Sequence, residues 1–157
     1  MKKFILATSI LILTVFATNA QSYDTGIGLR GGPFAGITGK HFITENAAVE
    51  GILTTRWKSI EITALYEIHE IAFDTPGLYW FYGAGAHIGF GGDGIHHPRI
   101  NAIGNYSYFG IDGIIGMEYV LEEIPFTIGL DWKPVINIVG YSDLWADGGA
   151  LSVRYIF

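Results

Sequence analysis

The chain contains no cysteine among its 157 residues, so no disulfide bond can stabilise its fold. It is also poor in basic residues, with 9 Lys and Arg against 15 Asp and Glu, which argues against a nucleic-acid partner because such partners require basic patches. After its first twenty positions it has no apolar run of about 20 residues, the length that a membrane-spanning helix needs. Yet hydrophobic residues make up 50% of the chain, accompanied by 22 glycines. Apolar residues spread in this way are typical of membrane strands rather than membrane helices.

The first twenty residues have the pattern of a targeting segment. Lys2 and Lys3 supply a positive start, an apolar run follows, and Thr18-Asn19-Ala20 offers small residues where a signal peptidase cuts. We therefore expect a signal peptide at 1–20 and one mature domain at 21–157, with an N-terminal membrane anchor as the alternative. No cysteine follows the apolar run, which excludes a lipid-anchored form.

Eight stretches of the mature region alternate apolar and polar side chains, with turn-forming residues between them. This period of two predicts β-strands, and no stretch shows the 3.6-residue period of a helix. The expected strands cover residues 23–32, 34–43, 47–58, 59–71, 78–90, 106–120, 125–138 and 147–157. Pro134 interrupts the seventh strand, where we expect a bulge near the outer rim.

The fifth stretch shows this alternation most clearly. Its apolar face carries Trp80, Tyr82, Ala84, Ala86, Ile88 and Phe90, while the other face is rich in glycine. Aromatic residues at both ends of an apolar face are typical of strands that cross a membrane in a barrel, and a glycine-rich face suits a narrow interior. A soluble, lipocalin-like barrel has the same rhythm with its faces reversed, and this is the alternative orientation.

Charged residues on the polar faces are nearly balanced in sign. Because buried charges need partners, we expect them to form a paired network inside the barrel. Its expected members are the basic residues Arg30, Lys40, Arg56, Lys133 and Arg154 and the acidic residues Glu50, Glu61, Glu67, Asp112, Glu118 and Asp131. In eight strands the interior only just holds its side chains, so this set predicts a plugged barrel without an open aqueous channel.

Connection lengths agree with a barrel whose two chain ends lie on one side. The connections at 44–46, 73–77 and 121–124 are short and would all face that side, whereas the longest ones, 91–105 and 139–146, would face the other. Two further connections, at Gly31-Gly32-Pro33 and Lys58-Ser59, are unusually tight for the long-loop side.

The chain ends on an alternating strand whose apolar face is Leu151, Val153, Tyr155 and the final residue Phe157. With the signal peptide, strand rhythm and loop lengths, this strand makes the mature region resemble the small Gram-negative outer-membrane barrels of the OmpA/OmpX type. In that family the terminal strand is the signal read by the barrel-insertion machinery. The resemblance implies an all-β, eight-stranded antiparallel up-and-down transmembrane β-barrel in the cell outer membrane. Its partners would be outer-membrane lipid and that machinery, and we expect a monomer.

Two groups of side chains prompt chemical hypotheses. Asp93, His96 and His97 could bind a transition metal, although a Gly-rich surface loop is the simpler interpretation. His69 and His87 lie on polar faces, but no His-x-Ser spacing accompanies them, and pairing with carboxylates is the expectation. We therefore expect no catalytic residue, cofactor or metal, and a structural or surface-interaction role. The alternatives are a narrow pore for small or hydrophobic solutes and an outer-membrane lipid-modifying hydrolase; the sequence does not identify an external ligand.

Overall fold

The computed structural model describes residues 23–56, 59–91, 106–139, 143–146 and 148–157. Its strands are β1 (Thr25–Gly31), β2 (Ala35–Phe42), β3 (Ala47–Arg56), β4 (Ser59–Ile71), β5 (Leu78–Gly91), β6 (Tyr106–Val120), β7 (Phe126–Trp132), β8 (Val135–Val139), β9 (Asp143–Trp145) and β10 (Gly149–Ile156). In the described part of the chain, no helix has the length and apolarity to cross a membrane. The expected signal peptide at 1–20 lies outside the described residues, so the boundary at 21 stays a prediction.

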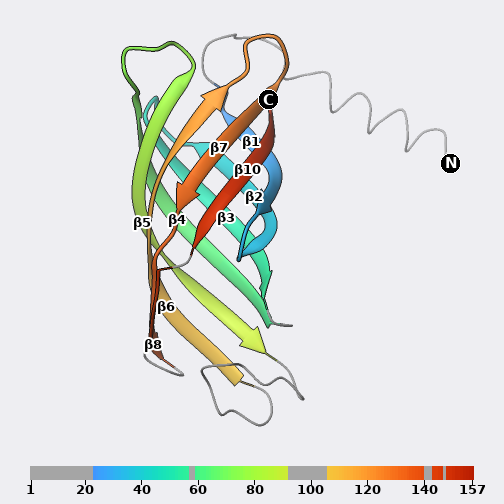
Figure 1. Cartoon of the computed structure of the whole chain (residues 1–157), viewed down its shortest axis with the longest axis vertical. Coiled ribbons are helices and arrows are strands. Elements are labelled where there is room, and N and C mark those ends of the chain that lie inside the picture. Colours follow the sequence, from blue (N-terminus) through green and yellow to red (C-terminus); the bar gives the residue numbers. More distant parts are fainter. Residues whose placement is uncertain (1–22, 57–58, 92–105, 140–142, 147) are drawn as a thin grey trace, which may run out of the picture.

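The strands form one antiparallel sheet that closes on itself, as Figure 1 shows. The sheet runs β5-β4-β3-β2-β1-β10-β7-β6, and a further pairing of β6 with β5 closes it. β7 and β8 both pair with β6, so they are two parts of one interrupted strand. β9 pairs with β8 and β10 pairs with β7, so β9 and β10 are likewise two parts of one interrupted strand. The fold is therefore an eight-stranded up-and-down antiparallel barrel, which confirms the predicted fold class.

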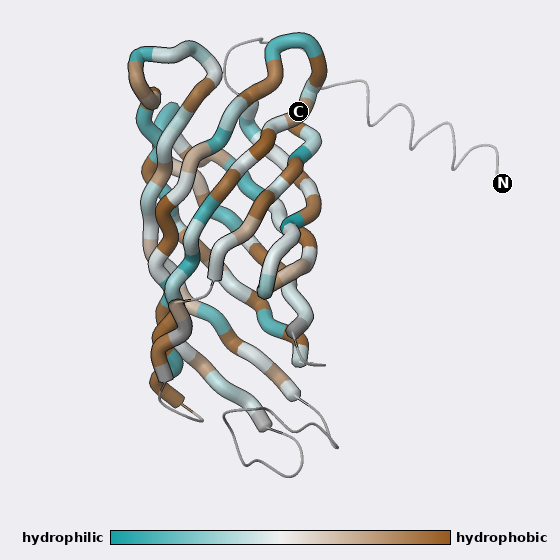
Figure 2. The backbone as a smooth tube through the Cα atoms, viewed as in Figure 1, coloured by the Kyte–Doolittle hydropathy of each residue, from teal (hydrophilic) through white to brown (hydrophobic). Residues whose placement is uncertain are grey.

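Charged side chains face the interior and large apolar side chains face outward. Along β4, Glu61, Glu67 and His69 are buried, whereas the alternate residues Ile60 and Ile62 are exposed. The same alternation gives the mixed colouring along each strand in Figure 2. The lipocalin-like orientation, with an apolar interior and a polar exterior, is therefore not the one this chain adopts.

Inward-facing glycines make room for large side chains on the neighbouring strand. A Cβ at Gly89 would lie 2.0 Å from the ring of Tyr108, which is its cross-strand partner on β6. In the reverse direction, a Cβ at Gly110 of β6 would lie 2.5 Å from the ring of its partner His87. The glycine-rich face predicted for the fifth strand thus has a packing reason: Gly89 leaves space for the Tyr108 ring, and Gly83 and Gly85 lie against the backbone of β4.

Pro134 divides the seventh strand into β7 and β8. The register with β6 continues across the break, because Ile115 pairs with Trp132 and Asp112 with Val135. The register shift lies further along, opposite Phe109 and Gly110 of β6. The sequence therefore located the interruption, and the irregular pairing occurs closer to the end of the strand.

The two ends of the barrel differ. We call the end with the β2–β3, β4–β5 and β6–β7 connections the turn end, and the opposite end the loop end; the C-terminus lies at the turn end (Figure 1). At the turn end Thr25 and Phe157 exchange two backbone hydrogen bonds, of 2.9 and 3.0 Å, which join the first and last strands of the barrel. Closure leaves no free strand edge along this seam.

The charged interior as candidate functional site

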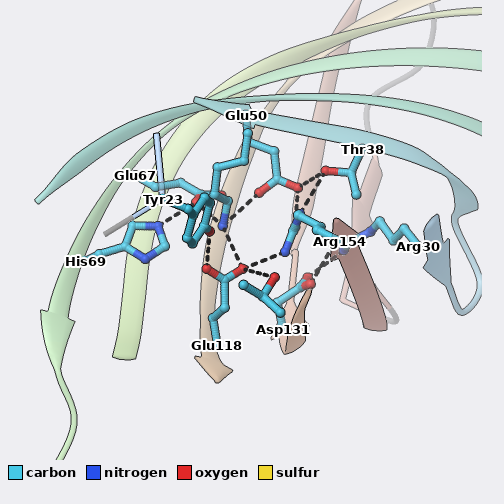
Figure 3. A network of polar contacts seen from close by, with 11 residues as sticks. Tyr23, Arg30, Thr38, Glu50, Glu67, His69, Glu118, Asp131 and Arg154 are labelled. Atoms are coloured by element: carbon cyan, nitrogen blue, oxygen red, sulfur yellow. Dashed lines mark hydrogen bonds and ion pairs between the residues drawn. The ribbon is translucent and has the colours of Figure 1, made fainter. Parts of the chain in front are cut away.

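The largest group of interior charges lies toward the turn end and is drawn in Figure 3. Arg154 lies between two carboxylates, with Nη2 2.6 Å from Glu50 Oε1 and Nη1 2.8 Å from Glu118 Oε2. Lys40 Nζ lies 2.8 Å from Glu67 Oε2 and 3.2 Å from Glu50 Oε2. These five residues, which we call the turn-end network, come from β2, β3, β4, β6 and β10. Their ion pairs therefore connect strands around most of the barrel wall.

Neutral side chains supply further hydrogen bonds to this network. The Tyr23 hydroxyl donates to Glu118, and the Thr38 hydroxyl donates to Glu50. Burial and the nearby Glu118 carboxylate raise the pKa of Tyr23, which precedes β1, so its hydroxyl keeps its proton and remains a donor. His69 Nε2 lies 3.1 Å from Glu67 Oε2, and its ring stacks on Phe81 with 5.0 Å between the centroids.

The contribution of Tyr23 can be measured by removing only its hydroxyl. We expect Tyr23→Phe to lower the free energy of unfolding by about 2 kcal/mol, because a buried carboxylate loses a donor. Tyr66→Phe is the matched control, since Tyr66 is exposed on the outer face of β4 and should change stability by less than about 0.5 kcal/mol. Urea unfolding of both variants in detergent checks this; equal effects would contradict the assigned role of Tyr23.

A second group lies toward the loop end. Lys133 Nζ is 2.7 Å from Asp112 Oδ1 and 3.5 Å from Glu61 Oε1. His87 contacts Asp112 Oδ2 through Nδ1 and Asn137 Oδ1 through Nε2, both at 2.8 Å. We call these five residues the loop-end network. Both ring nitrogens of His87 are thus occupied by partners that hold the imidazole in place.

The interior also contains an apolar cluster and a further ion pair. Ile52, Leu65, Phe81 and Ile114 form a buried cluster. Arg30 donates two parallel hydrogen bonds to Asp131, each 2.5 Å long, a bidentate geometry typical of strong ion pairs. Among the described side chains, no ion pair connects the turn-end network with the loop-end network.

The sequence assigned eleven charged residues to the interior of the barrel. Ten of them have described side chains and all ten are buried: Arg30, Lys40, Glu50, Glu61, Glu67, Asp112, Glu118, Asp131, Lys133 and Arg154. Arg56 ends β3, and its side chain lies outside the described part. The charges form three groups rather than the single expected network. Sequence reasoning missed Tyr23, which precedes the first strand, and Asn137, although alternation along β8 places Asn137 on the inner face.

The residues expected to form the insertion signal lie on the outer face of the last strand. Leu151, Val153, Tyr155 and Phe157 are all exposed, and Tyr155 packs against Phe126 of β7 with 5.5 Å between the ring centroids. They line the seam between the first and last strands. Their recognition by insertion machinery stays a prediction.

The sequence raised two chemical hypotheses, a histidine-based hydrolase and a metal site. His69 has a hydrogen bond with Glu67, and His87 has hydrogen bonds with Asp112 and Asn137, so these partners are carboxylates and an amide rather than serine hydroxyls. No group of three or more His, Asp or Glu side chains within the described ranges is arranged to hold a metal ion. Asp93, His96 and His97 lie outside those ranges.

These features define a class: a closed, narrow β-barrel with paired charges inside and an apolar outer wall. No protein-family model, curated protein or solved structure matches the chain.

Proposed function

We propose that the mature chain is an integral, non-enzymatic protein of the bacterial outer membrane, with lipid against its apolar wall and a plugged interior. The orientation of the two faces is the observation that carries this proposal. Leu29 and Leu130 are 69% and 65% exposed, while Lys40 and Glu67 are almost fully buried. A continuous apolar wall is unfavourable in water, whereas a bilayer accepts it and a closed barrel satisfies the backbone hydrogen bonds that lipid cannot.

Aromatic side chains on the outer face support this placement. Tyr66, Tyr82 and Tyr119 are exposed toward the turn end, and Phe90 and Phe109 are exposed toward the loop end. Two such girdles, separated by aliphatic residues, mark the two interfaces of outer-membrane barrels. On this proposal the segment at 1–20 directs export, and the last strand directs insertion.

The filled interior supports a structural or surface-interaction role rather than transport. Buried carboxylates and cations from β2, β3, β4, β6 and β10 meet across the turn-end half of the barrel, and Phe81, with the apolar cluster it belongs to, packs against Lys40. A pore would need a continuous polar path past these side chains. The barrel would instead contribute to the integrity of the membrane or present its loop end at the cell surface.

Fractionation of cells that express the full chain tests the location. We expect the protein in outer membranes, resistant to alkaline extraction, and with different mobility in boiled and unboiled detergent gels. Recovery as a soluble periplasmic protein would contradict the proposal. The purified protein in planar bilayers should show no discrete conductance steps, and reproducible steps would favour the pore instead.

The proposed insertion signal predicts a sequence-specific effect. Phe157→Ala should reduce the assembled, heat-modifiable form several-fold, because the terminal aromatic residue of the last strand is lost. Val139→Ala is the matched control, since Val139 is also an exposed outward residue but ends β8. Quantifying the unboiled gel band in isolated membranes checks this, and equal assembly of the two variants would disprove a special role for Phe157.

A further inference from the structure

The wall of the barrel is much lower on one side than on the other. β1 and β2 contain 7 and 8 residues, whereas β5 and β6 contain 14 and 15. All four strands have one end at the turn end, so the difference appears at the loop end. Figure 1 shows the β1–β2 hairpin turning back well before β5, β6 and β8 end.

Strand geometry converts these lengths into heights. A strand rises about 3.4 Å per residue, and at a tilt of about 40° this gives roughly 2.6 Å of height per residue. β2 therefore spans about 20 Å and β6 about 39 Å along the barrel axis. The apolar band of an outer-membrane barrel is about 25 Å tall, so the β1–β2 hairpin is too short to cross a membrane of that thickness.

The residues at the tip of the β1–β2 hairpin, the short side of the barrel, are consistent with its low height. The one large apolar residue of the hairpin tip, Phe34, is turned inward, where its ring centroid lies 5.1 Å from Lys133 Nζ. Outside the barrel the tip presents Gly31, Gly32 and Pro33, all exposed. The outward residue beside Ala35 on β3 is Thr55, which is polar and exposed.

The tall side continues its apolar face to a greater height. Phe90 of β5 and Phe109 of β6 are exposed 12 and 11 residues from the turn-end limits of their strands, Leu78 and Val120, whereas Pro33 at the hairpin tip lies 9 residues from Phe42. A bilayer of uniform thickness that covered these residues would also bury the hairpin tip in hydrocarbon. Its turn backbone would then lie where lipid offers no hydrogen-bond partner.

We infer that the bilayer is locally thinned beside the β1–β2 hairpin, with the lipid headgroups of the loop-end leaflet drawn down to the level of Ala35. This inference rests on the proposed membrane location. Thinning the bilayer is the established response of lipid to a wall that is too short, and it costs only fractions of a kcal/mol per Å of mismatch. The barrel thus has a defined weak side for lipid packing, formed by β1 and β2.

Two alanines make a matched pair for the test. Ala35 and Ala86 both belong to the outer face, and they lie 7 and 8 residues from the turn-end limits of β2 and β5, Phe42 and Leu78. Because the chain has no cysteine, Ala35→Cys and Ala86→Cys can each carry a single spin label in the full-length barrel. Thr44→Cys, in the exposed β2–β3 turn, reports the turn-end level of the short side.

The labelled proteins are reconstituted alone in phosphatidylcholine vesicles, and collisions with oxygen and with an aqueous nickel chelate are measured. We expect the label at Ala86 to favour oxygen and the labels at Ala35 and Thr44 to favour the nickel chelate. The depth parameter should therefore change sign between the two alanine positions, although their distances from the turn-end limits of their strands differ by only one residue.

Other outcomes overturn the inference in distinguishable ways. Oxygen preference at both alanine positions would mean a uniform bilayer around a true membrane barrel. Nickel access at both would contradict the membrane location itself. A protected label at Thr44 would indicate a tilted barrel, and protection of Ala35 from both reagents would indicate that protein, such as a second copy, covers the short side.

Discussion

Arg154→Met is expected to lower the free energy of unfolding by about 3–5 kcal/mol, or to abolish folding. Arg154 is the common partner of Glu50 and Glu118, and all three side chains are almost completely buried. Methionine fills a comparable volume, so the effect isolates the charge. Two carboxylates would remain in a low-dielectric interior with only Lys40 to compensate them.

This prediction is measured by urea titration in detergent, with the unboiled gel band as the folded signal. Val153→Met is the matched control, because Val153 is the adjacent residue on the outer face and should change stability by less than about 1 kcal/mol. Adding Glu50→Gln and Glu118→Gln to Arg154→Met should restore much of the loss, since no unpaired charge then stays buried. A loss of less than about 1 kcal/mol from Arg154→Met would show that the charges are not sealed from water.

Gly85→Ala is expected to destabilise the barrel by about 3 kcal/mol. A Cβ at this position would lie 1.9 Å from the backbone oxygen of Ala64 on β4. The obstacle is backbone rather than a flexible side chain, so the two strands would have to move apart. Such a shift would disturb their shared register around His87 and Thr63.

Gly39→Ala is the control for this substitution. Gly39 also lies within a strand, but a Cβ there has no atom within 4 Å. Its effect should lie within about 0.5 kcal/mol. Unfolding both variants in the same detergent gives a direct comparison. Equal stabilities would mean that the wall near Gly85 is looser than the backbone geometry indicates.

Alternation along the chain predicted the eight main strand regions and their faces, but it missed β9 (Asp143–Trp145), which pairs with β8 inside the expected 139–146 connection. Period-two patterns placed all eight strand regions, because one face of each strand must differ chemically from the other when the sheet closes. The same rule placed residues such as Glu61 and Lys133 on the inner face before any pairing was known.

Alternation could not predict which charges meet. Arg154 and Glu50 are 104 positions apart, and their contact depends on the register of every strand between them. The division into separate networks therefore emerges only from the closed barrel. The low height of the β1–β2 hairpin could not be predicted either. The tight Gly31-Gly32-Pro33 connection was visible in the sequence, but the height of the hairpin relative to β6 depends on the tilt and the register of the strands.

The most direct test of the account uses two adjacent residues on opposite faces of the last strand. Leu151 is exposed and Ser152 is buried, and each can be changed to a single cysteine in an otherwise cysteine-free chain. With a fluorophore at residue 151, brominated lipid should quench the emission, whereas the thiol at 152 should react with neither lipid-soluble nor water-soluble maleimide until the barrel is unfolded. Rapid labelling at 152 by the water-soluble reagent, with no lipid quenching at 151, would contradict a sealed, charged interior surrounded by lipid.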